Sequence, residues 1–314
     1  MKRVGAVAVG TAAGLILPEP PRRIHPVGLF GSVAARAEMA AWAPSRLAGA
    51  LYWTALVGGT YALGTTTARR SGERAVAISL ALAVGGGALY RSARIVCDAL
   101  GIGRVEEARV LMKALVSRDA DSLDEAAMVR GCVESVAENT VDAIAAPAVF
   151  ALLAGAPGVS AYRAANTLDA MVGYRTPLYR DFGWFAARMD DIANYLPARL
   201  TVLATALCRP RLARSILAAA RYQGRFHPSP NGGPVEAAFA SALGIMLGGP
   251  ALYGGVIEDR PQLGWGRPPR PGDIERAIVL SRQVTALSVV LACGTYLAGA
   301  LAWHRLGLRL FLSR

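Results

Sequence analysis

The chain has 314 residues, of which 54% are hydrophobic and only 18% are charged. A typical soluble domain carries roughly 25% charged residues, so the composition excludes a disordered chain and argues against an ordinary soluble enzyme. The net charge is +12, and lysine occurs only at positions 2 and 113, so that nearly all the basic residues are arginine. Such a balance suits anionic lipid or an anionic substrate. Nucleic acid is the least favoured partner, because the uncharged segments leave no soluble domain to bind it.

Three uncharged runs reach the roughly 20 residues that a membrane-spanning helix needs. They are residues 47–68, 237–257 and 284–303. Shorter uncharged runs, each a tilted span, a re-entrant element or a buried helix, cover residues 4–17, 75–90, 143–159 and 200–208. The sequence therefore predicts an all-α, polytopic integral membrane bundle, with the plasma membrane as its location and lipid as a partner.

The remaining segments fit one membrane-embedded domain over residues 1–314. We expect a retained helix at the N-terminus, and a polar amphipathic insertion at about 91–140. A basic amphipathic helix at 211–221 is typical of a helix that lies on lipid headgroups. The Pro- and Gly-rich stretch at about 254–272 predicts a loop.

The most informative stretch reads ESVAENTVD, from Glu134 to Asp142. At 100° per residue, Glu134, Glu138 and Asp142 fall within an arc of about 80° on one helix face, where like charges repel. The next 17 residues are uncharged, so these acids stand at a membrane boundary, where they are costly unless they face a wet cavity, a cation or a partner. Mg²⁺ would explain the stripe, because it prefers carboxylate oxygen. The structural alternative is a solvated helix start with acids at the positive end of the dipole.

A second polar stretch runs over residues 162–199. Arg163, Asn166 and Asp169 are spaced by three and share a helix face. Oxygen ligands in this stretch are Asn166, Asp169, Asp190, Asp191 and Asn194, and anion donors are Arg163, Arg175, Arg188 and Arg199. Any one of these side chains could instead belong to a structural ion pair, such as Arg188 with Asp191.

Two histidine-containing segments could form edges of an active site. His25 follows two arginines, although a single histidine is more often structural. The turn HPSPNGGP at 227–234 includes Asn231 and could offer exposed backbone amides to an anion, or could be a plain connector.

The motifs that stand out are, in chain order, HPVG at 25–28, ESVAENTVD at 134–142, NTLDAMVGY at 166–174, YRDFGWFAARMDDIANYLPARLT at 179–201 and NGGPVEAAFASALG at 231–244. In kind and order they resemble the CobD/CbiB family of cobalamin biosynthesis, the adenosylcobinamide-phosphate synthases. The resemblance covers nearly the whole chain. Ala143 stands where many members have glycine, a departure that bears on packing.

The resemblance implies a multi-pass membrane enzyme. It would join (R)-1-amino-2-propanol or its O-phosphate, through an amide bond, to a propionate carboxylate of adenosylcobyric acid, beside other membrane enzymes of cobalamin assembly. Because a carboxylate and an amine do not condense unaided in water, ATP with Mg²⁺ is the expected activator, although the chain has no G-x-x-x-x-G-K-[ST] loop.

For such a reaction the polar residues can be given roles as hypotheses. Magnesium and the activating phosphate would be held by Glu134, Glu138, Asp142, Asp169, Asp190 and Asp191. Phosphate or substrate would be bound by Arg163, Asn166, Tyr174, Arg175, Arg188, Asn194, Arg199 and Asn231. His25 or an acid that binds no metal would accept a proton from the attacking ammonium.

Two other functions fit the same residues. One is an intramembrane, magnesium-dependent prenyl- or phospho-alcohol transferase, which also needs clustered acids at a membrane edge. The other is a non-catalytic membrane sensor or scaffold, which would tolerate the loss of the carboxylates.

The position of residues 143–159 decides whether one site can form. If this run fully crossed the membrane, the acids at 134–142 would lie opposite those at 166–194. We therefore predict that the run, with Pro147 and Pro157, is re-entrant or a half-span. Soluble substrates favour a site that opens to the cytoplasm.

Overall fold

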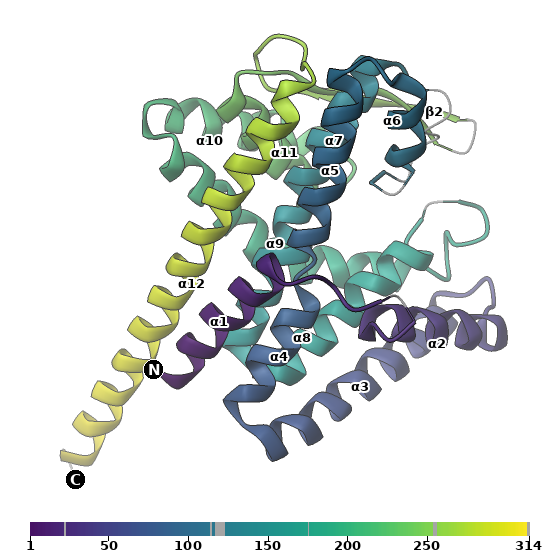
Figure 1. Ribbon diagram of the computed structural model, residues 1–314. Coiled ribbons are helices and arrows are strands. Elements are labelled where there is room, and N and C mark those ends of the chain that lie inside the picture. The colour runs from purple at the N-terminus through teal and green to yellow at the C-terminus, as the bar shows by residue number, and fades with distance from the viewer. Residues whose placement is uncertain (22, 114, 117–122, 175, 254–255, 313–314) are drawn as a thin grey trace.

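The computed structural model describes the whole chain except residues 22, 114, 117–122, 175, 254–255 and 313–314 (Figure 1). The described part is almost entirely helical, as the all-α prediction requires. The helices are α1 (Lys2–Ile16), α2 (Pro26–Ala41), α3 (Arg46–Ser71), α4 (Glu73–Ala83), α5 (Gly86–Gly101), α6 (Val105–Met112), α7 (Glu125–Thr140), α8 (Ala146–Val172), α9 (Trp184–Cys208), α10 (Ala213–Tyr222), α11 (Gly232–Leu243) and α12 (Gly272–Leu312). One antiparallel hairpin, β1 (Leu247–Tyr253) and β2 (Val256–Leu263), is the exception.

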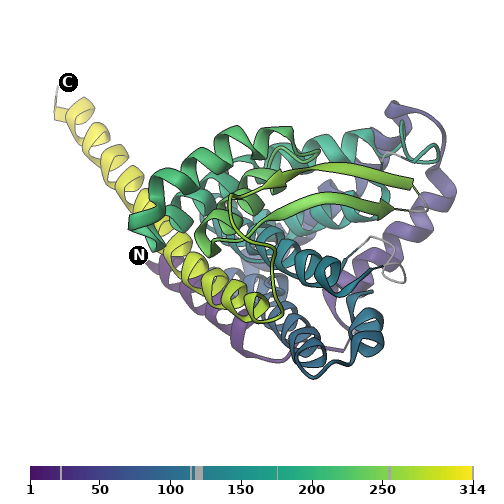
Figure 2. The same cartoon turned by 90° about the horizontal axis from the view of Figure 1, so that it is seen from above.

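The helices form two regions that meet at the middle of the molecule. Figure 1 shows α5, α6, α7, α10 and α11 in the upper region and α1, α3 and α4 in the lower one, while α12 runs along both. Figure 2 shows the β-hairpin lying across the upper end, where its strands pack against α7 and α11. Helices α8 and α9 pack on each other and connect the regions.

Helix α7 lies at the centre of the hydrophobic core. Its N-cap is Asp124, whose side chain accepts a hydrogen bond from the Ala127 amide at 2.7 Å. Most of its residues are buried on every side, so the amphipathic character expected over 91–140 does not extend to this helix. A π-helical turn, Val141–Ala145, follows directly and leads into α8. Such turns are rare and are frequent at functional sites.

Helix α8 is a hairpin of two helical arms. Gly155 has φ 66° and ψ −151°, a positive-φ conformation that favours glycine, and Pro157 starts the returning arm, where it has no amide hydrogen to leave unpaired. The arms lie side by side, since the Phe150 and Tyr162 rings stack at 5.0 Å and the Tyr162 hydroxyl donates to the Asp142 carbonyl at 3.1 Å. Residues 134–142 and 162–169 therefore lie at the same end. How this hairpin lies in a bilayer stays a prediction.

Within the part of the chain that the structure describes, three helical stretches are long and apolar enough to cross a membrane: Glu73–Gly101, Glu125–Val172 and Gly272–Trp303. These stretches fit a membrane protein. Of the predicted spans, only 284–303 lies within them. Residues 47–68 form most of α3, but the many glycines and threonines of that helix lower its mean hydropathy, and it is not among the three.

The predicted span at 237–257 is wrong. Helix α11 ends at Leu243, because Gly244 adopts a left-handed conformation with φ 66°, and the chain continues as β1. The residues of α11 are buried almost throughout, so the apolar composition of this helix reflects burial in protein rather than in lipid. The loop expected at 254–272 is also wrong in part, because β2 occupies Val256–Leu263.

Helix α3 contacts the segment that leads into α9 through a glycine. A Cβ atom at Gly49 would lie 1.8 Å from the Phe182 carbonyl oxygen, whereas nothing lies within 4 Å of a Cβ at Gly58 in the same helix. We expect Gly49→Ala to destabilise the protein by about 1–3 kcal/mol through overpacking. Thermal unfolding in detergent measures this as a melting temperature lower by several degrees. Gly58→Ala is the matched control and should be neutral or stabilising; equal effects of the two changes would contradict the contact.

The α8 hairpin predicts the sidedness of two exposed positions. With the four native cysteines replaced by alanine, Glu125→Cys and Arg180→Cys should both react with a membrane-impermeant maleimide from the same side of sealed vesicles. Lysed vesicles provide the control that both thiols are reactive. Labelling from opposite sides would show that the chain crosses the membrane between the two positions, which a re-entrant hairpin does not do.

Candidate functional site

Two polar cavities adjoin each other between α7, α9 and the turn at 227–232. The first, which we call the aspartate chamber, has about 280 Å³ and is lined by Asp142, Asp169, Asp190, Asp191, Asn194 and Asn231, among others. The second, the histidine chamber, has about 210 Å³ and is lined by Glu134, His227 and Glu236, among others. Glu138, Pro228, Ser229 and Arg260 line both, so the two chambers adjoin at these residues, and we refer to them together as the hollow.

In the aspartate chamber, asparagine amides lie between the carboxylates. The Asn166 Nδ2 atom donates to Asp142 Oδ2 at 3.3 Å and to Asp190 Oδ1 at 3.2 Å. Asn194 lies one turn after Asp190 on α9 and donates to its Oδ2 at 2.9 Å, while the Tyr162 hydroxyl donates to Asn194 Oδ1 at 2.8 Å. Acids and amides predicted from separate stretches are therefore joined by direct hydrogen bonds.

The local electrostatics disfavour the ionised form of Asp190. Burial raises the pKa of its carboxyl above the usual range, and the hydrogen bonds from Asn166 and Asn194 only partly oppose that shift. The negative charge of Asp191 raises it further. A buried carboxylate of this kind is stabilised by a cation that approaches from the chamber.

The donor set of the aspartate chamber suits magnesium chemically, because it consists of carboxylate and amide oxygen. Among the described residues, no group of three or more His, Cys, Asp or Glu side chains is arranged to hold a metal ion. Magnesium is commonly held by only one or two carboxylates, with water and phosphate as its other ligands. Asp142 and Asp190, both in contact with Asn166, could supply that number.

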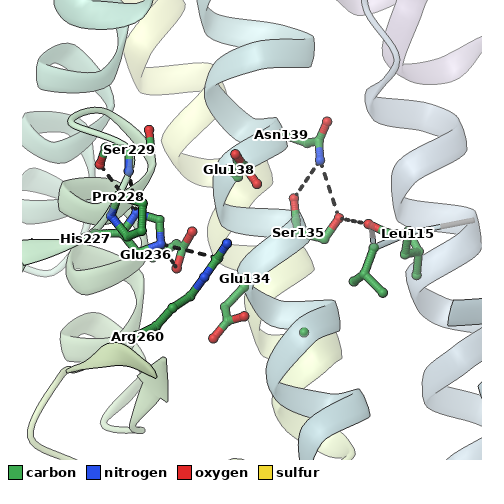
Figure 3. Close-up of a pocket in the computed structure, with 12 residues that line it drawn as sticks. Leu115, Glu134, Ser135, Glu138, Asn139, His227, Pro228, Ser229, Glu236 and Arg260 are labelled. Carbon is green, nitrogen blue, oxygen red and sulfur yellow. Dashed lines mark hydrogen bonds and ion pairs between the residues drawn. The ribbon is translucent and has the colours of Figure 1, made fainter. Parts of the chain in front are cut away.

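The histidine chamber is built around the buried side chains of Glu134, His227 and Glu236 (Figure 3). His227 Nδ1 accepts a hydrogen bond from the Ser229 amide at 3.1 Å, and Nε2 lies 3.9 Å from Glu236 Oε2. Both side chains are only 5% exposed. Arg260 reaches in from β2, with one guanidinium nitrogen 3.5 Å from His227 Nε2. On the opposite wall, Glu134 accepts a hydrogen bond from the Gly248 amide of β1 at 2.8 Å.

Several predicted residues support this hollow without lining it. Arg199 donates to Asn231 Oδ1 at 2.7 Å, and Asn231 donates to the Asp191 carbonyl at 2.7 Å, which ties the turn at 227–232 to α9. Arg163 donates to the Asp142 carbonyl at 3.4 Å. Arg188 forms an exposed ion pair with Asp191 at 3.2 Å. These arginines hold the walls in place.

Other expected site residues lie elsewhere. His25 is the N-cap of α2, where its Nδ1 accepts the Val27 amide at 3.2 Å, and it lines neither chamber. The Tyr174 side chain is 46% exposed and also lines neither. Arg175 is outside the described residues.

The turn at 227–234 does not present free amides to an anion at three of its positions. The amides of Asn231 and Gly232 donate to the Ser229 hydroxyl at 3.3 and 2.9 Å, and that of Ser229 donates to His227. The turn therefore contributes side chains, rather than free backbone amides, to the hollow.

The sequence interpretation placed His227 in a turn at a possible edge of the active site without giving it a role, and it missed Glu236 and Arg260. His227 and Glu236 lie nine residues apart, one in the turn that precedes α11 and the other on α11 itself, and no helical or strand spacing relates them. Arg260 belongs to a stretch that was expected to be a loop. Only the pairing of β2 with β1 places Arg260 beside α7 and α11.

Comparisons with known proteins point to one family over most of the chain. A family model described as CobD/Cbib protein matches residues 7–281. The chain is 44% identical over 295 residues to a Mycobacterium tuberculosis protein named Cobalamin biosynthesis protein CobD, covering 91% of this chain and 94% of the relative. Proteins of the same name from Stutzerimonas stutzeri and Rhodobacter capsulatus are 42% and 39% identical, covering 83% and 89% of this chain and 87% and 92% of theirs. No solved structure gives a significant match.

The raised pKa of Asp190 predicts a pH-dependent stability difference. A carboxyl whose pKa is raised in the folded state costs nothing at low pH and destabilises the fold as the pH rises through that pKa. We therefore expect Asp190→Asn to melt about 2–4 °C above the parent at pH 8, equivalent to roughly 1 kcal/mol, with the difference shrinking at pH 5. Asp98→Asn, exposed on α5, is the control. A variant that is less stable than the parent at pH 8 would show that the carboxylate is stabilised in its charged form.

Proposed function

Because the chain belongs to the CobD/CbiB family, we propose that it is an enzyme of cobalamin biosynthesis. The proposed reaction is the amide ligation of (R)-1-amino-2-propanol, or its O-phosphate, to a propionate carboxylate of adenosylcobyric acid. The product is adenosylcobinamide or its phosphate. The relatives' shared name supports the pathway, and the geometry of the two chambers supports the reaction.

One observation carries the proposal: acids from α7, the π-turn, α8 and α9 converge on a single hollow. Asp142, Asp169 and Asp190 come from three different segments and line the same chamber. Repulsion and desolvation make this arrangement costly for folding alone. A cationic ligand or a metal–phosphate complex would balance the charge, and ligation of a carboxylate to an amine brings both.

The size of the hollow restricts what enters it. Chambers of about 280 and 210 Å³ are far too small for a corrin macrocycle. They admit the end of one flexible side chain and a small amine. The macrocycle therefore stays outside, and specificity within the hollow is for the propionate arm and the donor.

The side chains of the aspartate chamber suit the chemistry of a carboxylate that must be activated. Asp142 and Asp190, with Asp169 nearby, would hold magnesium. ATP with magnesium would supply the activation that a carboxylate needs before an amine can displace an oxygen from it. Asn166 and Asn194 fix the directions of the Asp142 and Asp190 carboxylates.

The amine must lose a proton before its nitrogen can attack. Glu138 lines both chambers, so its carboxylate can accept that proton where the amine and the carboxylate meet. The nitrogen lone pair then forms the C–N bond while the activated oxygen leaves with its electron pair. A second proton leaves the nitrogen as the amide forms.

An apolar groove favours a second candidate function. The groove has about 570 Å³, lies between α2, α3, α4 and α8, and is lined in part by Arg163, which also contacts Asp142. A prenyl chain in this groove would bring a diphosphate to Arg163, as a magnesium-dependent lipid transferase requires. Consumption of a prenyl diphosphate without any use of adenosylcobyric acid would favour this reaction instead.

The proposed location is the plasma membrane, with the hollow open to the cytoplasm. The three apolar helical stretches support a membrane location. Adenosylcobyric acid, the aminopropanol donor and ATP are soluble, which supports a cytoplasmic opening.

Product formation by the purified protein tests the proposal. With adenosylcobyric acid, ATP, magnesium and either form of the donor, mass spectrometry should detect the amide product. Asp142→Asn and Asp190→Asn should lower the rate at least ~100-fold, because each removes a carboxylate from the chamber.

The matched control for these variants is Asp98→Asn, which should leave the rate within about twofold. Asp190→Asn is expected to fold at least as well as the parent at pH 8, so its loss of activity would not be a loss of structure. Near-normal turnover by both chamber variants would contradict the catalytic role of these carboxylates, whereas the absence of product with the parent protein would agree with a non-catalytic scaffold.

A further inference from the structure

The part of the chain around α10 carries positive charge and no acidic residue. Between Asp191 and Glu236 the sequence has six arginines but no lysine, aspartate or glutamate. Four exposed arginines lie on α10 or within three residues of it: Arg211, Arg214, Arg221 and Arg225. No described carboxylate forms an ion pair with any of the four. This surface, which we call the basic face, therefore keeps its positive charge available to an external group.

Large apolar side chains alternate with these arginines along the same segment. Four of them are exposed, namely Leu212, Leu217, Tyr222 and Phe226. The Arg225 guanidinium carbon lies 4.5 Å from the centre of the Phe226 ring. Arginine interleaved with leucine and aromatic residues is typical of a helix in the interfacial region of a bilayer, where apolar groups enter the lipid and guanidinium groups stay at the headgroups. A surface that binds only a soluble anion has no use for exposed leucine.

The orientation of α10 is fixed by its buried side. The residues of that side are Ile216, Ala219 and Ala220, and the helix packs on α9 and α11. Leu217 lies three residues after Arg214 and four before Arg221, so these three share one helix face. That face is opposite the buried one and is exposed. The basic face is therefore a fixed feature of the folded protein.

One contact places the basic face at a defined height along α12. Arg209, between α9 and α10, donates to Gln283 Oε1 at 2.9 Å. Gln283 directly precedes the uncharged run at 284–303, and Figure 2 shows the C-terminal part of α12 extending away from the rest of the molecule. Residues 298–303 are exposed, as expected of an apolar helix surrounded by lipid. The basic face thus begins where the apolar run begins, which is the headgroup level of a bilayer that α12 enters.

We propose that the basic face binds the anionic headgroups of a membrane leaflet, with its exposed leucine and aromatic side chains in the interfacial region. The guanidinium groups donate to phosphate oxygens of acidic phospholipids such as phosphatidylglycerol. This inference does not rest on the proposed reaction. Because Phe226 directly precedes the turn at 227–232, the same contact holds the hollow close to the headgroups.

Lipid-specific quenching in the reconstituted full-length protein tests the proposal. The four native cysteines are replaced by alanine, and a fluorophore is attached after Leu217→Cys. The vesicles are phosphatidylcholine with a small fraction of phosphatidylglycerol or phosphatidylcholine that is spin-labelled close to the headgroup. Quenching by the phosphatidylglycerol should be at least about threefold stronger at equal mole fraction, because basic side chains near the surface attract acidic lipid. The difference should shrink as salt rises from about 0.05 to 0.5 M, since screening weakens the attraction.

A triple variant and a matched control separate the basic face from overall charge. Quenching by the two lipids should become nearly equal with Arg211→Gln, Arg214→Gln and Arg221→Gln combined. The control removes the same charge from exposed sites outside the basic face, and it should keep the preference for phosphatidylglycerol; it combines Arg36→Gln, Arg104→Gln and Arg180→Gln. The salt series needs no variant, so it decides the question even if the triple variant does not fold.

Three results would overturn the proposal. The first is equal quenching by the two lipids in the parent protein at low salt. The second is a label at position 217 that neither lipid quenches, while a label placed after Leu301→Cys on the apolar run of α12 is quenched. The third is shielding of the position 217 label by an RNA oligonucleotide together with equal quenching by the two lipids, which would assign the basic face to nucleic acid.

Discussion

The hydrogen bonds from one amide to two buried carboxylates are the contact on which the rest of the site depends. Asn166 can reach both Asp142 and Asp190 only because the chain reverses at Gly155 and brings the second arm of α8 back beside the π-turn. The amide replaces part of the hydration that each carboxylate loses on burial. Without that reversal the acidic stretches would lie at opposite ends of a helix, and the aspartate chamber would lose Asp169 from its wall.

Close backbone contacts made by glycine hold this arrangement together. Gly183 begins the approach to α9 so near to α8 that an added Cβ would lie 1.7 Å from the Val172 carbonyl oxygen, and Gly49 makes a comparable contact from α3. These contacts fix the position at which α9 starts, and hence the position of Asp190 and Asn194 relative to Asp142. The lower region thus acts as a rigid support for polar groups that repel one another.

The two chambers divide the charged groups by kind. Amide donors separate the carboxylates on the aspartate side, whereas the histidine side combines three glutamates with an arginine and a positioned imidazole. Glu138 and Arg260 belong to both sides. The proposed ligation would bring its two reacting groups together at these shared residues.

The sequence by itself determined the helical class, the apolar character, the family, and the acids and amides that line the aspartate chamber, because helical spacing and residue chemistry are local properties. It did not separate apolar residues buried in protein from those facing lipid, so α11 was taken for part of a span. The joining of His227, Glu236 and Arg260 was decided only by tertiary structure. These residues meet through a turn and a strand pairing, and no local periodicity records such long-range contacts.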